Sequence, residues 1–278
     1  MGFVFLFRGM CLLLSVLMAL FYFGEVKDFL FIFVHNIMSE IKPYMSTDDK
    51  RQQVEQMFDG ISSSYDLLNH LLSFGIDKGW RRRSINLIAD RKLSEVLDVA
   101  TGTADMAIRA CQTLDCKVVG CDISSKMIEI GQQKVDAAGL ADRVRLRQAD
   151  SEKLPFSSNR FDALTVAFGV RNFANLDRGL AEMSRVLKPG GRMVILEFST
   201  PQNVIFRTLY NFYFRHILPF VGGLISNDKD AYRYLCRSAM AFPSGKDFEA
   251  RLDLVGLRPV SSTPLTFGIA TAYLAEKP

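Results

Sequence analysis

Acidic residues flank a single glycine at a spacing that suits a nucleoside-containing ligand. Residues 95–100 are typical of a short buried strand, a tight turn follows around Gly102, and a second strand at 117–122 ends on Asp122. Glycine lets a ligand approach the backbone closely, and an acid at the end of the second strand can accept hydrogen bonds from both ribose hydroxyls. The pattern therefore predicts a nucleoside site at this turn.

The charges near the turn favour one class of ligand. A dinucleotide site would show G-x-G-x-x-G and an open helix N-terminus for pyrophosphate, whereas Gly102 stands alone between Asp98 and Asp105. Carboxylates attract a cation and repel a diphosphate. This suits S-adenosylmethionine, which carries a positive sulfonium and a positive amino group and has no phosphate. The alternative is an ordinary strand–helix–strand turn with incidental acids.

An alternation of strands and helices would bring several of these acids together. The elements expected after Asp122 are a helix at 124–138, strands at 143–150 and 161–168, a helix at 176–187 and a strand at 192–198. This alternation predicts an α/β fold with a doubly wound, mostly parallel sheet. Ligands of such sheets bind at the carboxyl ends of the strands. We therefore expect Asp98, Asp122, Asp150 with the adjacent Ser151, and the residues after Phe168 to meet in one crevice.

The segments on either side of this alternation are predicted to be helical. Residues 48–91 carry a helical pattern, with a break expected at 62–64 and a second helix opening at Trp80. Residues 201–243 form an aromatic insertion that we expect to build an apolar pocket or lid at the ligand edge, with plain core packing as the alternative. The last elements expected are a helix at 248–254 and a hairpin at 259–276.

The first 44 residues differ in composition from the rest of the chain. Residues 10–23 contain no charge and follow Arg8, but this run is short for a bilayer span, which needs about 20 apolar residues. A membrane anchor, a signal peptide and a start site further along, at Met38 or Met45, stay open as interpretations. The predicted division is an apolar extension at 1–44 and a single domain at 45–278.

Composition argues against several other classes of protein. A net charge of +4 over 278 residues does not call for nucleic acid, which usually needs a concentrated basic face. The five cysteines show no metal-ligand spacing, so we expect no metal site and reduced thiols. The chain has no N-P-P-Y motif for methylation of amino or amide nitrogen. A non-catalytic binding protein would have no need for the three acids at the strand ends.

Several motifs resemble those of the quinone-ring C-methyltransferases of menaquinone and ubiquinone biosynthesis. The resemblance covers roughly residues 45–277. Its motifs are V-L-D-V-A-T-G-T at 96–103, L-P-F at 154–156, F-G-V-R-N at 168–172, R-V-L-K-P-G-G at 185–191 and L-E-F-S at 196–199. The fourth is common to many methyltransferases, whereas F-G-V-R-N, together with Tyr65-Asp66 and the 210–219 segment, is far more specific. Ala104 departs from the family, which usually has a second glycine there.

The resemblance implies the class I S-adenosylmethionine-dependent methyltransferase fold and assigns residues to the donor site. Gly102 and Thr103 in the turn would hold the methyl donor, and Asp122 would bind its ribose. Asp150 and Ser151 would lie near the adenine.

The resemblance also implies an acceptor and the residues near it. These are Tyr65, Arg171 and Asn172, with Asn69 and His70 as further candidates. Because a guanidinium stays protonated, Arg171 is expected to orient or acidify an acceptor hydroxyl rather than to act as the base. The closer likeness is to the menaquinone branch, with 2-demethylmenaquinol as the acceptor. The ubiquinone-pathway C-methylation and another small aromatic acceptor are the alternatives.

A lipid acceptor has consequences for where the protein works. We expect a cytoplasmic protein that is peripheral to, or anchored in, the inner face of the cytoplasmic membrane, with a lipophilic quinol and the membrane surface as partners. The oligomeric state stays open.

Overall fold

A seven-stranded sheet organises the computed structural model, which describes residues 41–73, 75–218 and 228–278. The strands are β1 (Glu95–Val99), β2 (Lys117–Asp122), β3 (Val144–Gln148), β4 (Phe161–Ala167), β5 (Leu187–Phe198), β6 (Arg258–Leu265) and β7 (Ala270–Glu276). Their order is β3-β2-β1-β4-β5-β7-β6. The ladders from β3 to β5 are parallel, and β7 runs antiparallel to both of its neighbours. The predicted α/β fold with a mostly parallel sheet is confirmed.

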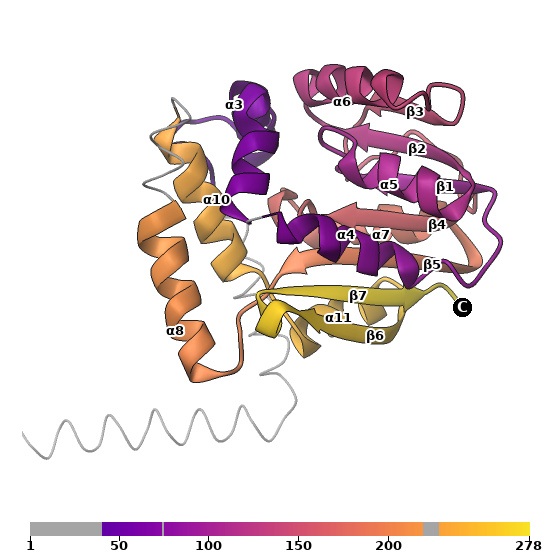
Figure 1. Cartoon of the computed structure of the whole chain (residues 1–278). Helices are drawn as coiled ribbons and strands as arrows, with labels where there is room; N and C mark the ends of the chain where they lie inside the picture. Colours follow the sequence, from indigo (N-terminus) through magenta and orange to yellow (C-terminus); the bar gives the residue numbers. More distant parts are fainter. Residues whose placement is uncertain (1–40, 74, 219–227) are drawn as a thin grey trace, which may run out of the picture. The chain divides into compact units, whose positions relative to one another are not determined.

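Helices and single turns connect and flank the strands (Figure 1). They are α3 (Lys50–Leu72), α4 (Ile76–Asn86), α5 (Asp105–Leu114), α6 (Ser125–Ala137), η1 (Val170–Asn172), α7 (Leu176–Val186), α8 (Val204–Phe212), η2 (Tyr213–Ile217), α10 (Lys229–Ala241), α11 (Lys246–Leu254) and η3 (Thr266–Gly268). The described parts of the aromatic insertion are therefore mostly helical, as predicted. Within the described ranges, no helix combines the length and the apolar character needed to cross a membrane.

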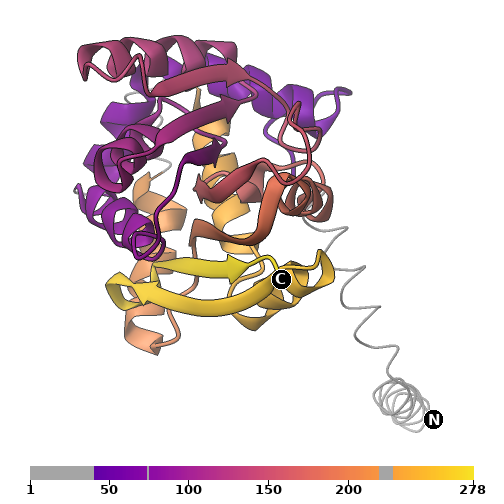
Figure 2. The same cartoon turned by 90° about the vertical axis from the view of Figure 1, so that its right-hand side faces the viewer.

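The sheet is covered on both faces, which explains its continuous apolar strands. Figures 1 and 2 show α4 and α5 over one face and α7 and α11 over the other. Val96, Val118 and Val194 of the strands are fully or almost fully buried in the same cluster as Ala107 of α5 and Ile85 of α4. Small residues on α5 let the helix pack closely against the strands. This core holds the strand ends in fixed positions.

The helix α3 corrects one prediction and shows why a local pattern misled. It runs without a break through the three serines at 62–64. Ser62 Oγ donates to the Asp59 carbonyl oxygen at 3.0 Å, and Ser64 Oγ donates to the Ile61 carbonyl oxygen at 3.2 Å, so both hydroxyls are satisfied inside the helix. Met57 packs in a cluster that includes residues of α10. Tertiary packing thus outweighs the weak helix propensity of serine.

The observed start of α4 differs from the predicted one, whereas the start of α6 agrees with it. α4 begins at Ile76, one turn before the predicted start at Trp80. α6 begins as expected, because the Ser124 side chain accepts a hydrogen bond from the Met127 amide at 3.1 Å and caps it.

The carboxyl ends of the parallel strands point toward α3 and α10 (Figure 1). The aromatic insertion therefore lies at the edge of the sheet where ligands of such folds bind. Residues 1–40 lie outside the described part of the chain, so the proposed extension at 1–44 stays a prediction.

Candidate active site

The backbone is strained where β1 and β4 end. Ala100, Gly102 and Ala104 follow β1 with φ values of +51°, +55° and +67°, and Phe168 follows β4 with +60°. Only glycine adopts such angles without cost, so the rest of the fold must hold the other three in place. The two turns also approach closely, since a Cβ on Gly169 would lie 2.5 Å from the Ala100 Cβ. The strand ends are thus rigidly shaped around a small space.

Ala104 occupies a position where the backbone adopts a left-handed conformation. This explains why relatives of the predicted family usually have glycine there. The alanine methyl is fully buried in the core between α5 and the sheet. Gly131 of α6 leaves room for it, because a Cβ on Gly131 would lie 3.3 Å from the Ala104 Cβ. Packing of this methyl offsets part of the backbone strain.

Asp122 lies at the end of β2 beside the glycine turn. Its Oδ2 accepts from the Gly102 amide at 2.8 Å, and its Oδ1 accepts from the Ser124 amide at 2.9 Å. Burial raises the pKa of this carboxyl, and the backbone hydrogen bonds counteract the rise. Each carboxylate oxygen keeps a second lone pair for a ligand hydroxyl. Asp122 is therefore held in the position that the ribose prediction requires.

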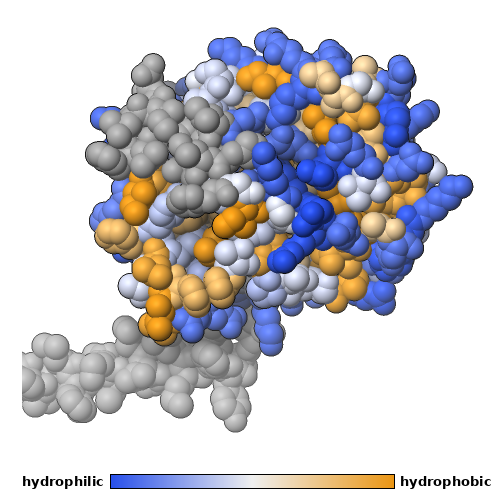
Figure 3. Space-filling view, viewed as in Figure 1, coloured by the Kyte–Doolittle hydropathy of each residue, from blue (hydrophilic) through white to orange (hydrophobic). Residues whose placement is uncertain are grey.

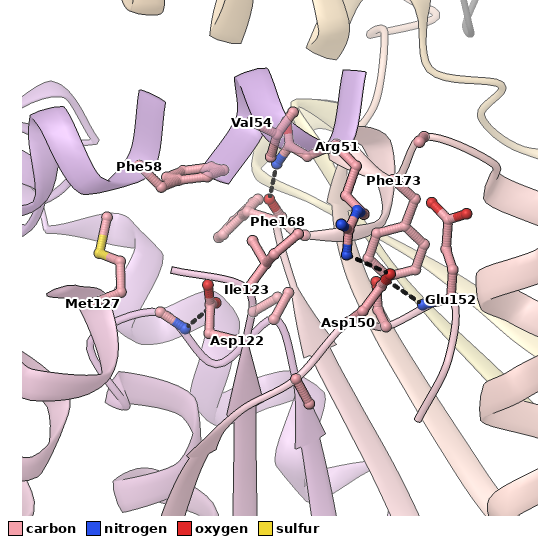
Figure 4. Close-up of a pocket in the computed structure, with 18 of the residues that line it drawn as sticks. Arg51, Val54, Phe58, Asp122, Ile123, Met127, Asp150, Glu152, Phe168 and Phe173 are labelled. Carbon is pink, nitrogen blue, oxygen red and sulfur yellow. Dashed lines mark hydrogen bonds and ion pairs between the residues drawn. The ribbon is translucent and has the colours of Figure 1, made fainter. Parts of the chain in front are cut away.

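The strand-end cavity, as we call the space at these turns, contains most of the predicted donor-site residues (Figure 4). The predicted residues that line it are Tyr65, Gly102, Asp122, Asp150, Ser151 and Asn172. The Asn172 Oδ1 is buried and finds no hydrogen-bond partner within the described residues. An unpaired buried acceptor of this kind calls for a ligand donor, such as an ammonium or a hydroxyl.

Other predicted donor-site side chains point elsewhere. Thr103 Oγ1 donates to Asp66 Oδ1 at 2.6 Å and accepts from Lys134, which also pairs with Asp105. Asp98 is buried beneath the cavity, where it accepts hydrogen bonds from Thr101 and Thr165. None of Thr103, Asp98 and Asp105 lines the strand-end cavity, so Asp98 does not meet Asp122 and Asp150 there as expected, while the assignment of Thr103 to the donor stays a prediction. They instead stabilise the turn that carries Gly102.

Helix α3 supplies a wall that the sequence analysis missed. Arg51, Val54 and Phe58 line the strand-end cavity, and Arg51 Nη1 lies 3.3 Å from Asp150 Oδ2 (Figure 4). The free space inside is about 60 Å³. The 99-residue separation of Arg51 and Asp150 explains why no local pattern indicated this contact.

Arg171 precedes Asn172 in η1, but its side chain faces away from the strand-end cavity that Asn172 lines. Its Nη1 donates to Glu197 Oε1 at 2.7 Å and to the Phe168 carbonyl oxygen at 2.6 Å. The Glu197 carboxyl is fully buried, which raises its pKa, and Arg171 opposes the rise. Arg171 does not line the strand-end cavity. It lines a second, larger space that we call the aromatic cavity.

The aromatic cavity has a volume of about 390 Å³ and is mostly apolar. The rings that line it include Trp80, Phe198, Phe206, Tyr210, Tyr213 and Phe214. Several come from the aromatic insertion, so the pocket prediction for that segment is supported over plain core packing. η1 carries Arg171 toward this cavity and Asn172 toward the strand-end cavity. The side chains of Asn69 and His70 lie outside the described part.

The residues that line the strand-end cavity fit S-adenosylmethionine as the methyl donor. The cavity combines a fixed acid for ribose at Asp122, a glycine that permits close approach at Gly102, an unpaired acceptor on Asn172 and a second acid at Asp150. Arg51, the basic residue among its described lining, is paired with Asp150. With the strand order β3-β2-β1-β4-β5-β7-β6 and the single reversed strand β7, these features define a class I S-adenosylmethionine-dependent methyltransferase.

Comparison with known proteins shows to which family of methyltransferases the chain belongs. The model of the ubiE/COQ5 methyltransferase family matches residues 46–277, so the chain belongs to that family. It is 46% identical over 239 residues to the demethylmenaquinone methyltransferase of Bacteroides fragilis, covering 86% of this chain and 98% of that relative. It is 47% identical over 231 residues to the ubiquinone/menaquinone biosynthesis C-methyltransferase UbiE of Geotalea daltonii, covering 82% and 98%.

Solved structures agree on the fold. The methyltransferase in a complex with the Trm112 activator from Haloferax volcanii aligns with a TM-score of 0.59 at 14% identity, over 80% of this chain and 97% of that one. An S-adenosylmethionine-dependent methyltransferase from Thermotoga maritima aligns with a TM-score of 0.58 at 15% identity, over 81% and 100%. The predictions of the fold, of a C-methyltransferase and of S-adenosylmethionine as its cofactor are confirmed.

Proposed function

We propose that this methyltransferase acts on a ring carbon of a demethylated polyprenyl quinol, with 2-demethylmenaquinol as the acceptor. The observation that carries the proposal is the aromatic cavity of about 390 Å³, which shares the η1 segment with the strand-end cavity. A planar ring held among aromatic side chains would lie beside the donor site. The names of the relatives from Bacteroides fragilis and Geotalea daltonii support a quinone-pathway acceptor.

The chemistry requires a nucleophilic ring carbon next to an electrophilic methyl group. S-adenosylmethionine supplies the methyl on a sulfonium, and the acceptor carbon becomes nucleophilic when the neighbouring hydroxyl loses its proton. The new C–C bond forms as the S–CH3 bond breaks, the sulfur keeps the electron pair, and the ring carbon then loses its proton. Opposite charges are neutralised along this path. Strong stabilisation of the phenolate would therefore slow the reaction, because it lowers the starting state more than the transition state.

Arg171 suits this requirement because Glu197 neutralises it. The ion pair is almost completely buried, so Arg171 presents hydrogen-bond donors without a full unpaired charge. Such a group can orient a ring hydroxyl while leaving the phenolate reactive. In-line positioning and exclusion of water would then supply much of the rate. We propose that Asn172 and Tyr65, which line the strand-end cavity, position the reacting groups from the donor side.

The rim of the aromatic cavity suits a lipid tail. Ile76, Leu209 and Phe267 line the cavity and are also exposed. Figure 3 shows apolar side chains gathered over α8, in the lower left of the view. Arg207 and Arg215 are exposed in the same segment and could contact anionic headgroups. We propose that a cytoplasmic enzyme rests on the inner face of the cytoplasmic membrane here, with the ring inside and the tail in the bilayer.

Analysis of the quinones extracted from cells that lack this protein tests the proposal. Mass spectrometry should show loss of menaquinone and accumulation of 2-demethylmenaquinone. Accumulation of a demethylated ubiquinone precursor instead would transfer the enzyme to that pathway. An unchanged quinone profile in cells without a second methyltransferase of this family would contradict both.

A further inference from the structure

The aromatic cavity contains few polar side-chain atoms, and several of them are already bonded. Trp80 Nε1 donates to Thr266 Oγ1 at 2.8 Å, and Ser73 Oγ donates to Asp77 Oδ1 at 2.8 Å. These groups need no ligand to satisfy them. They form part of the wall that joins α4 to η3.

Tyr210 of α8 differs from these residues. It lines the cavity and is 4% exposed, yet its hydroxyl has no hydrogen-bond partner within the described residues. The Arg171 Nε, in the same cavity wall, is likewise buried and without a partner among those residues. Burial raises the pKa of the Tyr210 phenol, and the nearby Arg171 charge opposes the rise. With the Tyr232 hydroxyl of α10, which lines the same cavity and also has no partner among the described residues, three hydrogen-bonding groups of this cavity are unsatisfied in the protein alone.

An unpaired buried hydroxyl lowers the stability of a protein. A phenylalanine at position 210 would keep a ring packed on Phe214, as the Tyr210 ring is now with the two ring centroids 4.2 Å apart. It would not bury an unsatisfied hydroxyl. A tyrosine at this position is therefore unfavourable for folding unless something bonds to it. An oxygen atom of a bound ring would do so.

The position of Tyr210 on α8 sets the orientation of such a ring. Its neighbour Leu209 is 61% exposed at the rim, whereas Tyr210 is buried and faces inward. The polar contact thus lies on the inner side of the cavity and the apolar surface at its mouth. A ligand with an oxygen-bearing ring and an apolar chain would enter ring first.

We propose that the Tyr210 hydroxyl, in the same cavity as the Arg171 Nε, binds a ring hydroxyl of the acceptor and fixes which ring carbon faces the methyl donor. This inference rests on the proposed function and extends it to a further residue of the acceptor site. Tyr210 accordingly contributes to substrate binding and orientation rather than to stability.

The variant Tyr210→Phe tests this assignment with a short-tailed 2-demethylmenaquinol as the acceptor. Loss of one hydrogen bond should raise the KM for the quinol by about threefold to tenfold. The affinity for S-adenosylmethionine, measured by calorimetry, should not change. The thermal unfolding midpoint of the ligand-free variant should equal or exceed that of the unchanged protein.

Two matched variants control for the loss of a phenol. Tyr234→Phe also removes a buried hydroxyl without a partner in the described part, but Tyr234 does not line either cavity, so the KM for the quinol should not change. Tyr273→Phe removes a hydroxyl that accepts from the Gly245 amide at 2.8 Å, so the unfolding midpoint should fall while the KM stays the same.

Each outcome either supports or overturns the inference. An unchanged KM for Tyr210→Phe, in a protein that methylates the quinol, would overturn it and leave the proposed function intact. An equal rise in KM for Tyr234→Phe would also overturn it, because position in the cavity would then not matter. Absence of quinol methylation by the unchanged protein, despite donor binding, would remove the proposed function itself.

Discussion

Arg171 and Glu197 form a buried ion pair between η1 and the end of β5. Arg171 Nη1 lies 2.7 Å from Glu197 Oε1, and the two side chains are 5% and 0% exposed. Phe168 contributes its carbonyl oxygen to the same guanidinium. The segment that separates the two cavities is thus held to the sheet by an almost completely buried charge pair. Changes to either partner should affect both the local geometry and the acceptor site.

Replacement of Arg171 by lysine tests its assignment to the acceptor. Lysine keeps the charge but lacks the planar fork that reaches Glu197 and the Phe168 carbonyl together, so turnover should fall. Donor affinity should stay nearly intact, because Arg171 lines the aromatic cavity and not the strand-end cavity. Turnover and a donor titration on the same preparation provide the comparison. Loss of donor binding in a folded variant would place Arg171 at the donor site instead.

Asp122 should carry much of the donor affinity. Asp122→Ala removes a charge-assisted contact to the ribose and should weaken S-adenosylmethionine binding by about 1.5–3 kcal/mol. Asp162→Ala is a suitable control, because that carboxylate also accepts two backbone amides, those of Ser94 and Glu95, but at the opposite end of the sheet. Isothermal titration of both variants decides the point. Equal donor affinity in Asp122→Ala and the unchanged protein would show that this carboxylate serves only the turn.

Asp98 should make stability depend on pH in a direction unusual for a carboxylate. Burial raises its pKa from 3.8 to about 6, and hydrogen bonds from Thr101 and Thr165 oppose the rise. The folded state therefore holds a proton that the unfolded chain releases. This contribution is fully present below the unfolded value of 3.8 and is lost as pH rises through about 6. The difference of roughly two units corresponds to about 3 kcal/mol of unfolding free energy.

Asp98→Asn should remove this pH dependence. Asparagine stays neutral, so the unfolding free energy of the variant relative to the unchanged protein should rise by about 2 kcal/mol between pH 4 and pH 7. Urea denaturation at several pH values across that range measures the difference. Any constant offset from changed hydrogen bonding with Thr101 and Thr165 cancels in this comparison. Parallel curves for the two proteins would contradict the raised pKa.

The outer face of α8 should bind membranes. Ile205 and Phe212 are 70% and 57% exposed, lie seven residues apart on one helix face, and do not line the aromatic cavity. The double change Ile205→Glu and Phe212→Glu should weaken binding to anionic vesicles by about tenfold or more. Turnover of a short-tailed quinol in detergent-free solution should not change.

Leu254 provides the control for this surface. It is 67% exposed on α11, away from the aromatic insertion, so Leu254→Glu should leave vesicle binding unchanged. Sedimentation with sucrose-loaded vesicles measures all three proteins. Full vesicle binding by the α8 double variant would show that this helix does not contact the bilayer.

The local sequence pattern was sufficient to predict the strands of the sheet and the residues at their carboxyl ends. An apolar run before the glycine turn located β1, an apolar run that ends on Asp122 located β2, and an alternating run that ends on Asp150 located β3. The rule that ligands bind at strand ends brought Asp122 and Asp150 together correctly. Local pattern failed where distant packing decides. The serines at 62–64 suggested a break that the contacts of Met57 override. The hydroxyl of Thr103 donates to Asp66, which is 37 residues away, and no local pattern indicated this contact.

Two kinds of feature had no signal in the sequence. The wall that Arg51 and its neighbours on α3 build over the strand-end cavity depends on a contact across 99 residues. The unsatisfied hydroxyl of Tyr210 depends on the absence of a partner within the described structure, which no motif encodes. A tyrosine among other aromatic residues reads only as apolar packing.

Methyl transfer to the ring is the central claim, and a labelled donor tests it most directly. The purified protein would be given S-adenosylmethionine with an isotopically labelled methyl group and reduced, short-tailed 2-demethylmenaquinol, with Asp122→Ala as the low-affinity control. The account predicts one labelled methyl on the ring carbon, located by NMR of the product, and a much lower rate for the variant at limiting donor. Label on a ring oxygen, or none in the quinol although the donor binds, would contradict it.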